Sequence, residues 1–226
     1  MMPEQWNAVD RYICESHVPQ DPGLEAALQL SAEVGLPKIN VSPNQGKFLQ
    51  ILARSIGSRN ILEIGTLGGY SAIWLARALP SGGRLVTLEL ETKHAEVARV
   101  NIANAGLSHC VELRVGRALD MMPRLAAERR GPFDLIFIDA DKENIPEYFT
   151  WSVKLSRPGS LIIVDNVIRK GAVVDSNSAD SSVRGVRRFH EMLAIAKHVS
   201  ATTIQTVGSK GYDGFTIALV NPHGMM

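Results

Sequence analysis

The chain has few cysteines, no long apolar run and almost no net charge, and each lack excludes a class of protein. Its 226 residues contain two cysteines, Cys14 and Cys110, which are too few for a disulfide framework. Lys and Arg number 24 against 23 Asp and Glu, so the net charge of +1 offers no basic excess for nucleic acid or an anionic membrane. The longest apolar runs, such as 161–164, are far too short to span a bilayer.

Several signatures of catalysis and targeting are also missing. The histidines show no paired spacing typical of zinc sites, and segment 69–73 lacks the final glycine of a nucleophile elbow. The first ten residues carry no basic segment followed by an apolar stretch, so no secretory signal is expected. Together with the low cysteine content, this predicts a cytoplasmic protein in a reducing compartment.

Apolar runs alternate with helix-period segments through the centre of the chain, which predicts an α/β fold. Strands are expected at 60–64, 84–90, 110–115, 134–139 and 159–165. Helices are expected between them, at about 70–79, 92–105, 118–129 and 143–156. This alternation is typical of a parallel sheet with helices on both faces, and the more polar third strand favours a place near an edge.

The two ends of the chain differ from this centre. Only helical patterns precede residue 59, at about 3–16, 22–35 and 43–57. After a long polar segment, 166–182, that we interpret as a lid, a helix at about 182–198 leads to strands at 202–207 and 214–220. The last connection is too short for a crossover, so these two strands should be antiparallel. We expect one domain, 1–226, made of an N-terminal helical segment, 1–58, and an α/β core, 59–226.

A glycine-rich turn follows the first strand and opens a helix. Gly65, Gly68 and Gly69 let backbone N–H groups and the helix start approach a ligand closely. Leu67 stands where a nicotinamide dinucleotide site needs its second glycine, and no Gly-Lys-Ser/Thr follows for a P-loop. A tight turn without a ligand is the alternative, but Glu63 at the strand end would then be a costly unpaired carboxylate.

The ends of the next two strands extend this candidate site. Glu89 closes the second strand, where an acid binds ribose hydroxyls in mononucleotide-binding folds, although an exposed strand-end acid is the alternative. Beyond the third strand, Gly116 and Ala118 are small enough to let an adenine ring lie flat, which is a weak signal by itself.

Oxygen donors follow the fourth and fifth strands, whose ends should open on one crevice where the strand order reverses. Asp139, Asp165 and Asn166 offer only oxygen, which suits Mg²⁺ first, with Ca²⁺ or Mn²⁺ as alternatives. The competing interpretation is a helix cap at Asp139 and an Asx turn at 165–166. For Asp141 we favour the capping role.

Lys142 lies three positions after Asp139, at the mouth of the same crevice. Like charge from a bound dication disfavours an ammonium group, so a lysine there can act as a general base. The alternative is a solvated surface lysine or a partner of Glu143.

With these residues in place, the chain resembles the cation-dependent class I O-methyltransferases, the caffeoyl-CoA and catechol O-methyltransferase family. The resemblance runs from about Val41 to the final strand, and three segments together carry it: 62–71, 137–142 and 158–166. It implies a Rossmann-like, doubly wound sheet of seven strands, mostly parallel with the last antiparallel. It also implies a homodimer that methylates a catechol-like small molecule with vicinal hydroxyls, and neither a nucleic acid nor a membrane as partner.

The resemblance also assigns residues. S-Adenosylmethionine would be surrounded by Val41, Glu63, Gly65, Thr66, Ser71, Glu89, Ala118 and Asp139. The metal would be held by Asp139, Asp165 and Asn166, and Lys142 would be the base. Relatives orient the acceptor with an acid near Asp213, which we place in the loop before the last strand. Arg117 and Leu119 depart from the small or amide residues that some relatives carry beside the adenine.

Two other functions are compatible with parts of the pattern: a non-catalytic S-adenosylmethionine-binding protein and an NAD-type dehydrogenase. The sequence leaves the acceptor open among a coenzyme A thioester, a free catechol, a flavonoid and an antibiotic precursor. Arg169 and Lys170 could meet an acidic acceptor, with solvated loop charges as the alternative.

Overall fold

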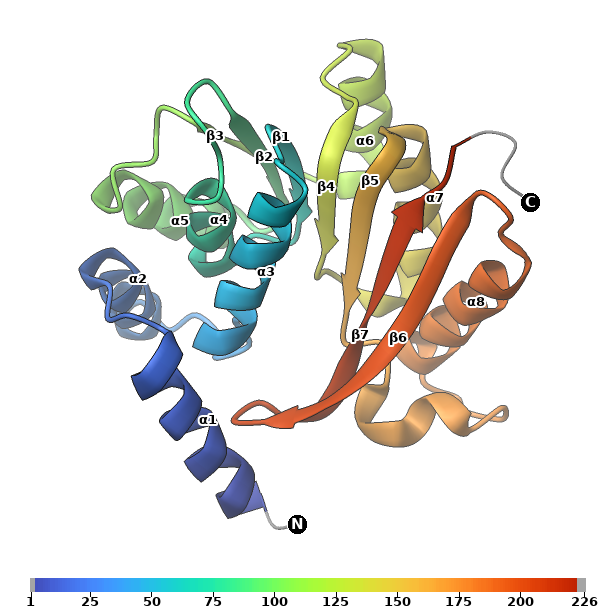
Figure 1. Ribbon diagram of the computed structural model, residues 1–226, viewed down its shortest axis with the longest axis horizontal. Coiled ribbons are helices and arrows are strands. Elements are labelled where there is room, and N and C mark those ends of the chain that lie inside the picture. The colour runs from blue at the N-terminus through green and yellow to red at the C-terminus, as the bar shows by residue number, and fades with distance from the viewer. Residues whose placement is uncertain (1–2, 223–226) are drawn as a thin grey trace.

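The fold is built on a sheet of seven strands in the order β3-β2-β1-β4-β5-β7-β6 (Figure 1). The computed structural model describes residues 3–222, so positions 1–2 and 223–226 of the expected domain lie outside the described residues. The strands are β1 (Asn60–Ile64), β2 (Arg84–Glu89), β3 (Val111–Val115), β4 (Phe133–Ile138), β5 (Ser156–Asp165), β6 (Val199–Gly208) and β7 (Gly211–Val220). The first five pair in parallel and β7 runs antiparallel to both neighbours, which confirms the predicted fold class. The polar β3 is an edge strand, as expected.

Helices cover both faces of this sheet because side chains alternate along its strands. In β4, Ile136 and Ile138 belong to one buried cluster, and Leu135 and Phe137 belong to the other. The first cluster includes side chains of α6 (Ala118–Ala127), α7 (Ile145–Lys154) and α8 (Ser181–Ile195). The second includes side chains of α2 (Pro22–Glu33), α3 (Pro43–Ser55), α4 (Tyr70–Ala76) and α5 (Thr92–Asn104).

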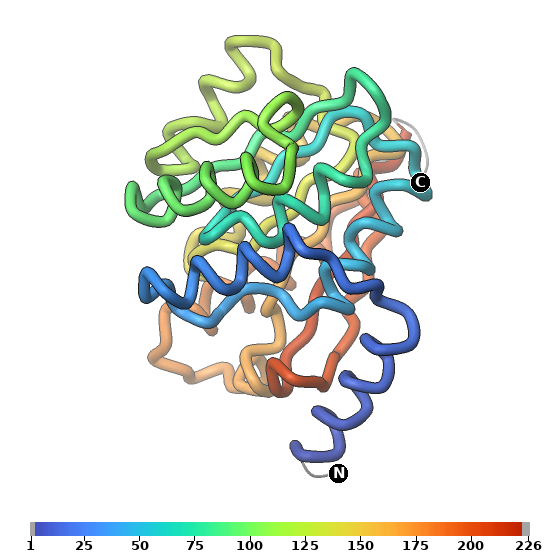
Figure 2. The backbone as a smooth tube through the Cα atoms, turned by 90° about the vertical axis from the view of Figure 1, so that its left-hand side faces the viewer, coloured from blue at the N-terminus to red at the C-terminus, as the bar shows by residue number. Residues whose placement is uncertain are grey.

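The N-terminal helices begin where the sequence provides caps. Asp21 and Ser42 accept hydrogen bonds from backbone N–H groups of α2 and α3, and a proline occupies the first turn of each helix. The first helix, α1 (Pro3–His17), has no buried residue among those described, and it extends away from the other helices (Figures 1 and 2). Asp10 holds it, because its carboxylate accepts hydrogen bonds from Asn44 Nδ2 at 3.0 Å and Ser209 N at 2.6 Å.

Three expected segments have different bounds. The final hairpin is longer than predicted, since β6 and β7 are joined by two residues and Gly211 supplies a positive φ of 92°. A 3₁₀ turn, η1 (Lys142–Asn144), precedes α7, which has Pro146 in its first turn. The segment expected as a lid contains a second 3₁₀ element, η2 (Arg169–Val174). Within residues 3–222, no helix is both long and apolar enough to cross a membrane.

The strand order places a crevice at one end of the sheet. From β1 the chain crosses over to β2 on one side, whereas β4 lies on the other side of β1. The loops that leave the carboxyl ends of β1 and β4 therefore diverge, and a doubly wound sheet binds its ligands between such loops.

Candidate functional site

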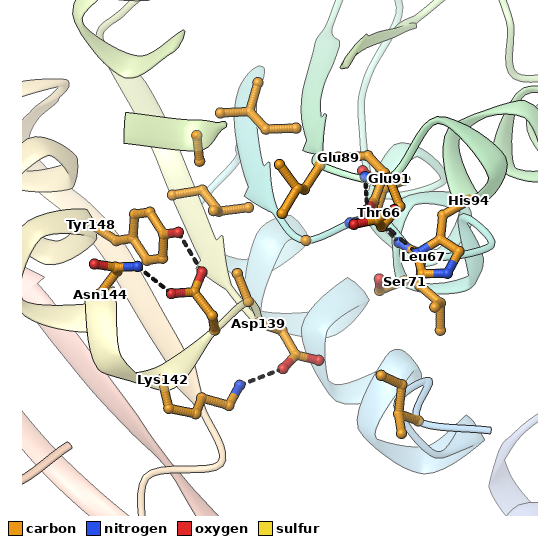
Figure 3. Close-up of a pocket in the computed structure, with 18 of the residues that line it drawn as sticks. Thr66, Leu67, Ser71, Glu89, Glu91, His94, Asp139, Lys142, Asn144 and Tyr148 are labelled. Atoms are coloured by element: carbon orange, nitrogen blue, oxygen red, sulfur yellow. Dashed lines mark hydrogen bonds and ion pairs between the residues drawn. The ribbon is translucent and has the colours of Figure 1, made fainter. Parts of the chain in front are cut away.

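A cavity of about 730 Å³ opens at this end of the sheet, a size typical of ligand pockets (Figure 3). Of the eleven residues to which the resemblance assigns a site role, nine line it: Val41, Gly65, Thr66, Ser71, Glu89, Ala118, Asp139, Lys142 and Asn166. Glu63 and Asp165 do not line it and are buried instead. The structure thus brings nine of the eleven together around one cavity and places the other two in the interior.

Gly65 allows the β1 turn to touch the end of β4. Its φ is +97°, and a Cβ at this position would overlap the carbonyl oxygen of Asp139. Both constraints exclude other residues. L residues rarely adopt this φ, and the carbonyl oxygen that a Cβ would overlap belongs to the backbone and cannot rotate away. The glycine therefore sets the separation of two segments that line the cavity.

Replacing Gly65 with alanine should lower the free energy of unfolding, because the two loops must move apart. It should also weaken binding of the cofactor that the resemblance implies, S-adenosylmethionine, by at least about tenfold. Gly57→Ala is the matched control, since Gly57 also has a positive φ, 63°, but an added Cβ there meets nothing within 4 Å. The control should cost about 1–2 kcal/mol from the left-handed backbone alone and leave binding unchanged. Urea unfolding and calorimetric titration measure both effects, and equal binding by the two variants would contradict the role of Gly65.

Glu63 is fully buried beside this turn. Its Oε2 accepts a hydrogen bond from Thr87 Oγ1 at 2.6 Å, while Oε1 has no hydrogen-bond partner among the described residues. Burial raises the pKa of Glu63 to about 8; the Ser71 and Thr87 hydroxyls oppose this rise, and the charges of Asp139 and Glu89 add to it. A positively charged group of a ligand near this buried carboxyl would favour its ionised form and could pair with the free oxygen.

This raised pKa makes the stability of the ligand-free protein depend on pH. The folded protein holds the Glu63 proton up to about pH 8, whereas the unfolded chain releases it near 4.5, so stability should fall as pH rises through this range. Glu63→Gln should remove that component and be more stable than the wild type at pH 9, with little difference at pH 4. Urea unfolding at both pH values measures the change, with Glu96→Gln as an exposed acid control. An unaltered pH slope in Glu63→Gln would refute the assignment.

Glu89 fastens the glycine turn to the end of β2. Its carboxylate accepts three backbone hydrogen bonds, from Thr66 N at 3.1 Å, Leu67 N at 2.7 Å and Glu91 N at 2.9 Å. A carboxylate offers about four acceptor positions, which leaves room for a hydroxyl of a ligand. His94 Nδ1 lies 3.5 Å from Glu89 Oε1 and also lines the cavity, and sequence reasoning did not identify this residue.

The predicted oxygen donors lie at the ends of the adjacent strands β4 and β5. Asp165 is 5% exposed, and its two carboxylate oxygens accept hydrogen bonds from Gln45 Nε2 at 2.7 Å and Asn166 N at 2.8 Å. Burial and, to a smaller extent, the negative charge of nearby Asp139 raise the pKa of Asp165, Lys142 opposes this rise, and the net value is about 7. Asp139 and Asp165 thus lie close enough for their negative charges to repel each other. A bound cation would neutralise this charge.

Histidine and cysteine do not contribute to this donor set. In the part of the chain that the structure describes, no three His, Cys, Asp or Glu side chains gather as a metal cluster. The donors expected from the sequence, two carboxylates and the Asn166 amide, offer only oxygen, and such a set would fit a hard cation rather than zinc. Sequence reasoning missed Gln45 of α3, which holds Asp165 from 120 positions away.

Lys142 is held inside the site rather than exposed on the surface. Its side chain lies in η1 and is mostly buried, and Nζ donates to Asp139 Oδ1 at 2.8 Å (Figure 3). The interpretation of Lys142 as a solvated lysine is therefore wrong. The capping role favoured for Asp141 is also wrong, because its side chain makes no cap hydrogen bond. It accepts hydrogen bonds from Tyr148 Oη at 2.5 Å and from Asn144 instead, since both side chains lie one or two helical turns ahead.

Asp213 lies inside β7, not in the loop before it as expected, because β7 already begins at Gly211. Its Oδ1 accepts hydrogen bonds from Ile168 N, Arg169 N and Gly214 N, each at 3.0 Å. Val167 N also donates to the carbonyl oxygen of Gly214 at 3.0 Å. The first half of segment 166–182 is therefore fastened to the sheet beside the cavity.

Comparisons with known proteins give consistent results. The family model described as O-methyltransferase matches residues 15–219. The chain is 54% identical over 215 residues to a catechol O-methyltransferase of Niastella koreensis, covering 95% of this chain and 97% of that protein. It is 52% identical over 212 residues to a catechol O-methyltransferase of Mycobacterium tuberculosis, covering 94% of each.

Two solved structures share the fold closely. One is an O-methyltransferase from Bacillus cereus in complex with SAH (S-adenosylhomocysteine), with a TM-score of 0.96, 58% identity and coverage of 97% of this chain and 100% of that one. The other is TomG from Streptomyces achromogenes, involved in tomaymycin synthesis and in complex with SAM (S-adenosylmethionine). Its TM-score is 0.95 with 56% identity, and the alignment covers 98% of this chain and 100% of that one.

Proposed function

Since the chain belongs to the O-methyltransferase family, we propose that it methylates one hydroxyl of a catechol-like small molecule with the help of a divalent cation. The coarser activity, O-methyl transfer from S-adenosylmethionine, follows from the family and its SAM- and SAH-bound relatives. That activity excludes both the NAD-type dehydrogenase and the non-catalytic binding protein. The observation that supports the finer proposal is the closeness of the Asp139 and Asp165 carboxylates beside a buried lysine, with Asn166 next to Asp165 in the chain and on the cavity wall.

The cavity has room for the methyl donor along its glycine-turn side. We assign the donor to Val41, Gly65, Thr66, Ser71, Glu89, Ala118 and Asp139, all of which line the cavity. Glu63 is buried behind this part of the cavity wall, where its unpaired oxygen favours a positively charged methyl donor. The acceptor then occupies the remaining part, between Lys142 and segment 166–169.

Asp139, Asp165 and Asn166 would hold the cation, with Mg²⁺ the first choice for an all-oxygen donor set. When bound, it would supply a Lewis acid that accepts two neighbouring hydroxyls and lowers the pKa of one of them. Gln45 keeps the Asp165 carboxylate oriented, because its amide donates to one oxygen and leaves further lone pairs for a ligand.

Lys142 is positioned to take the proton from the acceptor hydroxyl. In this structure Nζ donates to Asp139 and is held at the cavity wall. A cation bound by Asp139 would replace the lysine as the partner of that carboxylate and disfavour the ammonium form, so that a neutral amine is present to accept the proton. The resulting oxyanion attacks the sulfonium methyl group, so that the O–CH₃ bond forms as the CH₃–S bond breaks and S-adenosylhomocysteine leaves as a neutral thioether. The two opposite charges neutralise each other in the transition state. The site therefore gains most from alignment of the two reactants and from exclusion of water.

The direct test is an assay of purified protein with S-adenosylmethionine, Mg²⁺ and a panel of aromatic diols. We expect methylation of vicinal diols and none of the matched 1,3-diols, with the product mass and position determined by mass spectrometry and NMR. Equal rates on 1,2- and 1,3-diols would overturn the catechol assignment. The homodimer and the cytoplasmic location stay predictions.

A further inference from the structure

Arg169 stands on the cavity wall three residues beyond the candidate cation ligand Asn166. Its backbone is fixed in a conformation that L residues rarely adopt, with φ at 55°, and Lys170 repeats that value before Gly171 at 89°. Asp213 holds this turn by accepting from the Arg169 and Ile168 backbone N–H groups. Strained backbone that a buried network maintains is commonly found where a side chain must be aimed at a ligand.

The Arg169 side chain lacks partners of its own. It is half-buried, and within residues 3–222 its Nε is buried without a hydrogen-bond partner and its guanidinium forms no salt bridge. By contrast, Lys142 on the same cavity wall is paired with Asp139. A guanidinium that lines a cavity and has no acceptor among the described residues is available to an acceptor that a ligand brings.

We propose that Arg169 binds a carboxylate of the acceptor, so that the preferred substrate is an acidic catechol rather than a neutral or amine-bearing one. This inference rests on the proposed function. The guanidinium is a planar fork of N–H donors, and its two terminal nitrogens can bind a carboxylate with two parallel hydrogen bonds. Because Arg169 and Asn166 are three residues apart and line the same cavity, a carboxylate held by the guanidinium would belong to the molecule whose hydroxyls face the cation site. A short side chain on the catechol ring is enough to link the carboxylate to the two hydroxyls.

Three catechols that differ in one substituent test the inference: 3,4-dihydroxyphenylacetate, its primary amide, and 3,4-dihydroxyphenethylamine. With saturating S-adenosylmethionine and Mg²⁺, kcat/KM for the carboxylate should exceed that for the amide by about 10- to 100-fold, the value of one charge-assisted hydrogen-bonded pair. The amine should be the poorest substrate. The difference should lie mainly in KM, because the carboxylate is remote from the reacting oxygen.

Variants show which side chain causes the preference for the acid over the amide. Arg169→Gln should bring the acid-to-amide ratio close to one, and Arg169→Lys should retain part of it because a lysine lacks the fork. Lys170→Gln is the matched control, an exposed neighbour with the same backbone conformation, and should keep the wild-type ratio. Calorimetric titration of 3,4-dihydroxyphenylacetate into the protein saturated with S-adenosylhomocysteine gives a readout without turnover, and thermal unfolding shows whether Arg169→Gln is folded.

The outcomes separate the two proposals. Equal efficiency on the acid and the amide, or an unchanged ratio in folded Arg169→Gln, overturns the role of Arg169 and leaves the catechol function standing. Absence of methylation of all three catechols overturns the proposed function, and the acidic substrate class with it. If the preference for the acid disappears in Lys170→Gln instead, Lys170 rather than Arg169 binds the carboxylate, and the inference is also overturned.

Discussion

Replacing Lys142 with alanine lowers the turnover number by about 10²- to 10⁴-fold, the range that general base catalysis supplies. The affinity for S-adenosylmethionine should change far less, because the proposed role of Nζ is to move a proton of the acceptor. Steady-state kinetics give the turnover number, and calorimetric titration gives the affinity. Lys170→Ala, an exposed lysine on the neighbouring η2, should behave like the wild type.

The loss in Lys142→Ala should depend on the acidity of the acceptor. A catechol with a nitro group on the ring ionises more readily and needs a base less, so its methylation should be largely spared in the variant. An unsubstituted catechol should show the full loss. A lysine that served only to pair with Asp139 would give the same loss for both acceptors, which distinguishes the two roles. A normal turnover number with the unsubstituted catechol would remove Lys142 from the mechanism.

The parts of the site that lie at strand ends could be predicted from the sequence. Periodic apolar runs locate the ends of β1, β2, β4 and β5, and a doubly wound sheet brings these ends to one crevice. Glu89, Asp139 and Lys142 line the cavity for that reason, although they are distant in sequence. The same pattern predicted β3 at an edge, because fewer apolar residues mean less burial.

Contacts between elements could not be predicted in this way. No sequence pattern around Gln45 indicates that its side-chain amide reaches Asp165. That contact depends on how α3 packs with the other N-terminal helices. Asp213 was misplaced because β7 extends three residues beyond its apolar run, into a stretch with Gly211 and Tyr212. Asp141 carries the short side chain typical of a helix cap, and only the arrangement of η1 against α7 brings Tyr148 to it. Each of these outcomes was decided by tertiary packing.

Exhaustive treatment with EDTA should abolish methylation of a catechol, and added Mg²⁺ should restore it in full. The expectation rests on Asp139 and Asp165, whose like charges approach each other with Lys142 as the nearby cation that lowers the pKa of Asp165. A divalent ion would balance that charge, and a ligand that binds only the folded state stabilises it. Mg²⁺ should therefore also raise the midpoint of thermal unfolding.

Asp165→Asn tests the same site without relying on turnover alone. The amide is nearly isosteric, and its single oxygen keeps one of the two hydrogen bonds that Asp165 accepts, from Gln45 or from Asn166 N. We therefore expect a folded, less stable protein whose unfolding midpoint no longer responds to Mg²⁺ and whose turnover falls by at least about 100-fold. Asp134→Asn is a matched control in the same sheet, because Asp134 is a mostly buried acid at the start of β4 that pairs with Arg157, at the opposite end from the cavity. It should lose stability and keep its response to Mg²⁺. Full activity in the presence of chelator, together with an unchanged Mg²⁺ response in Asp165→Asn, would show that these carboxylates serve the fold and that the methyl transfer needs no cation.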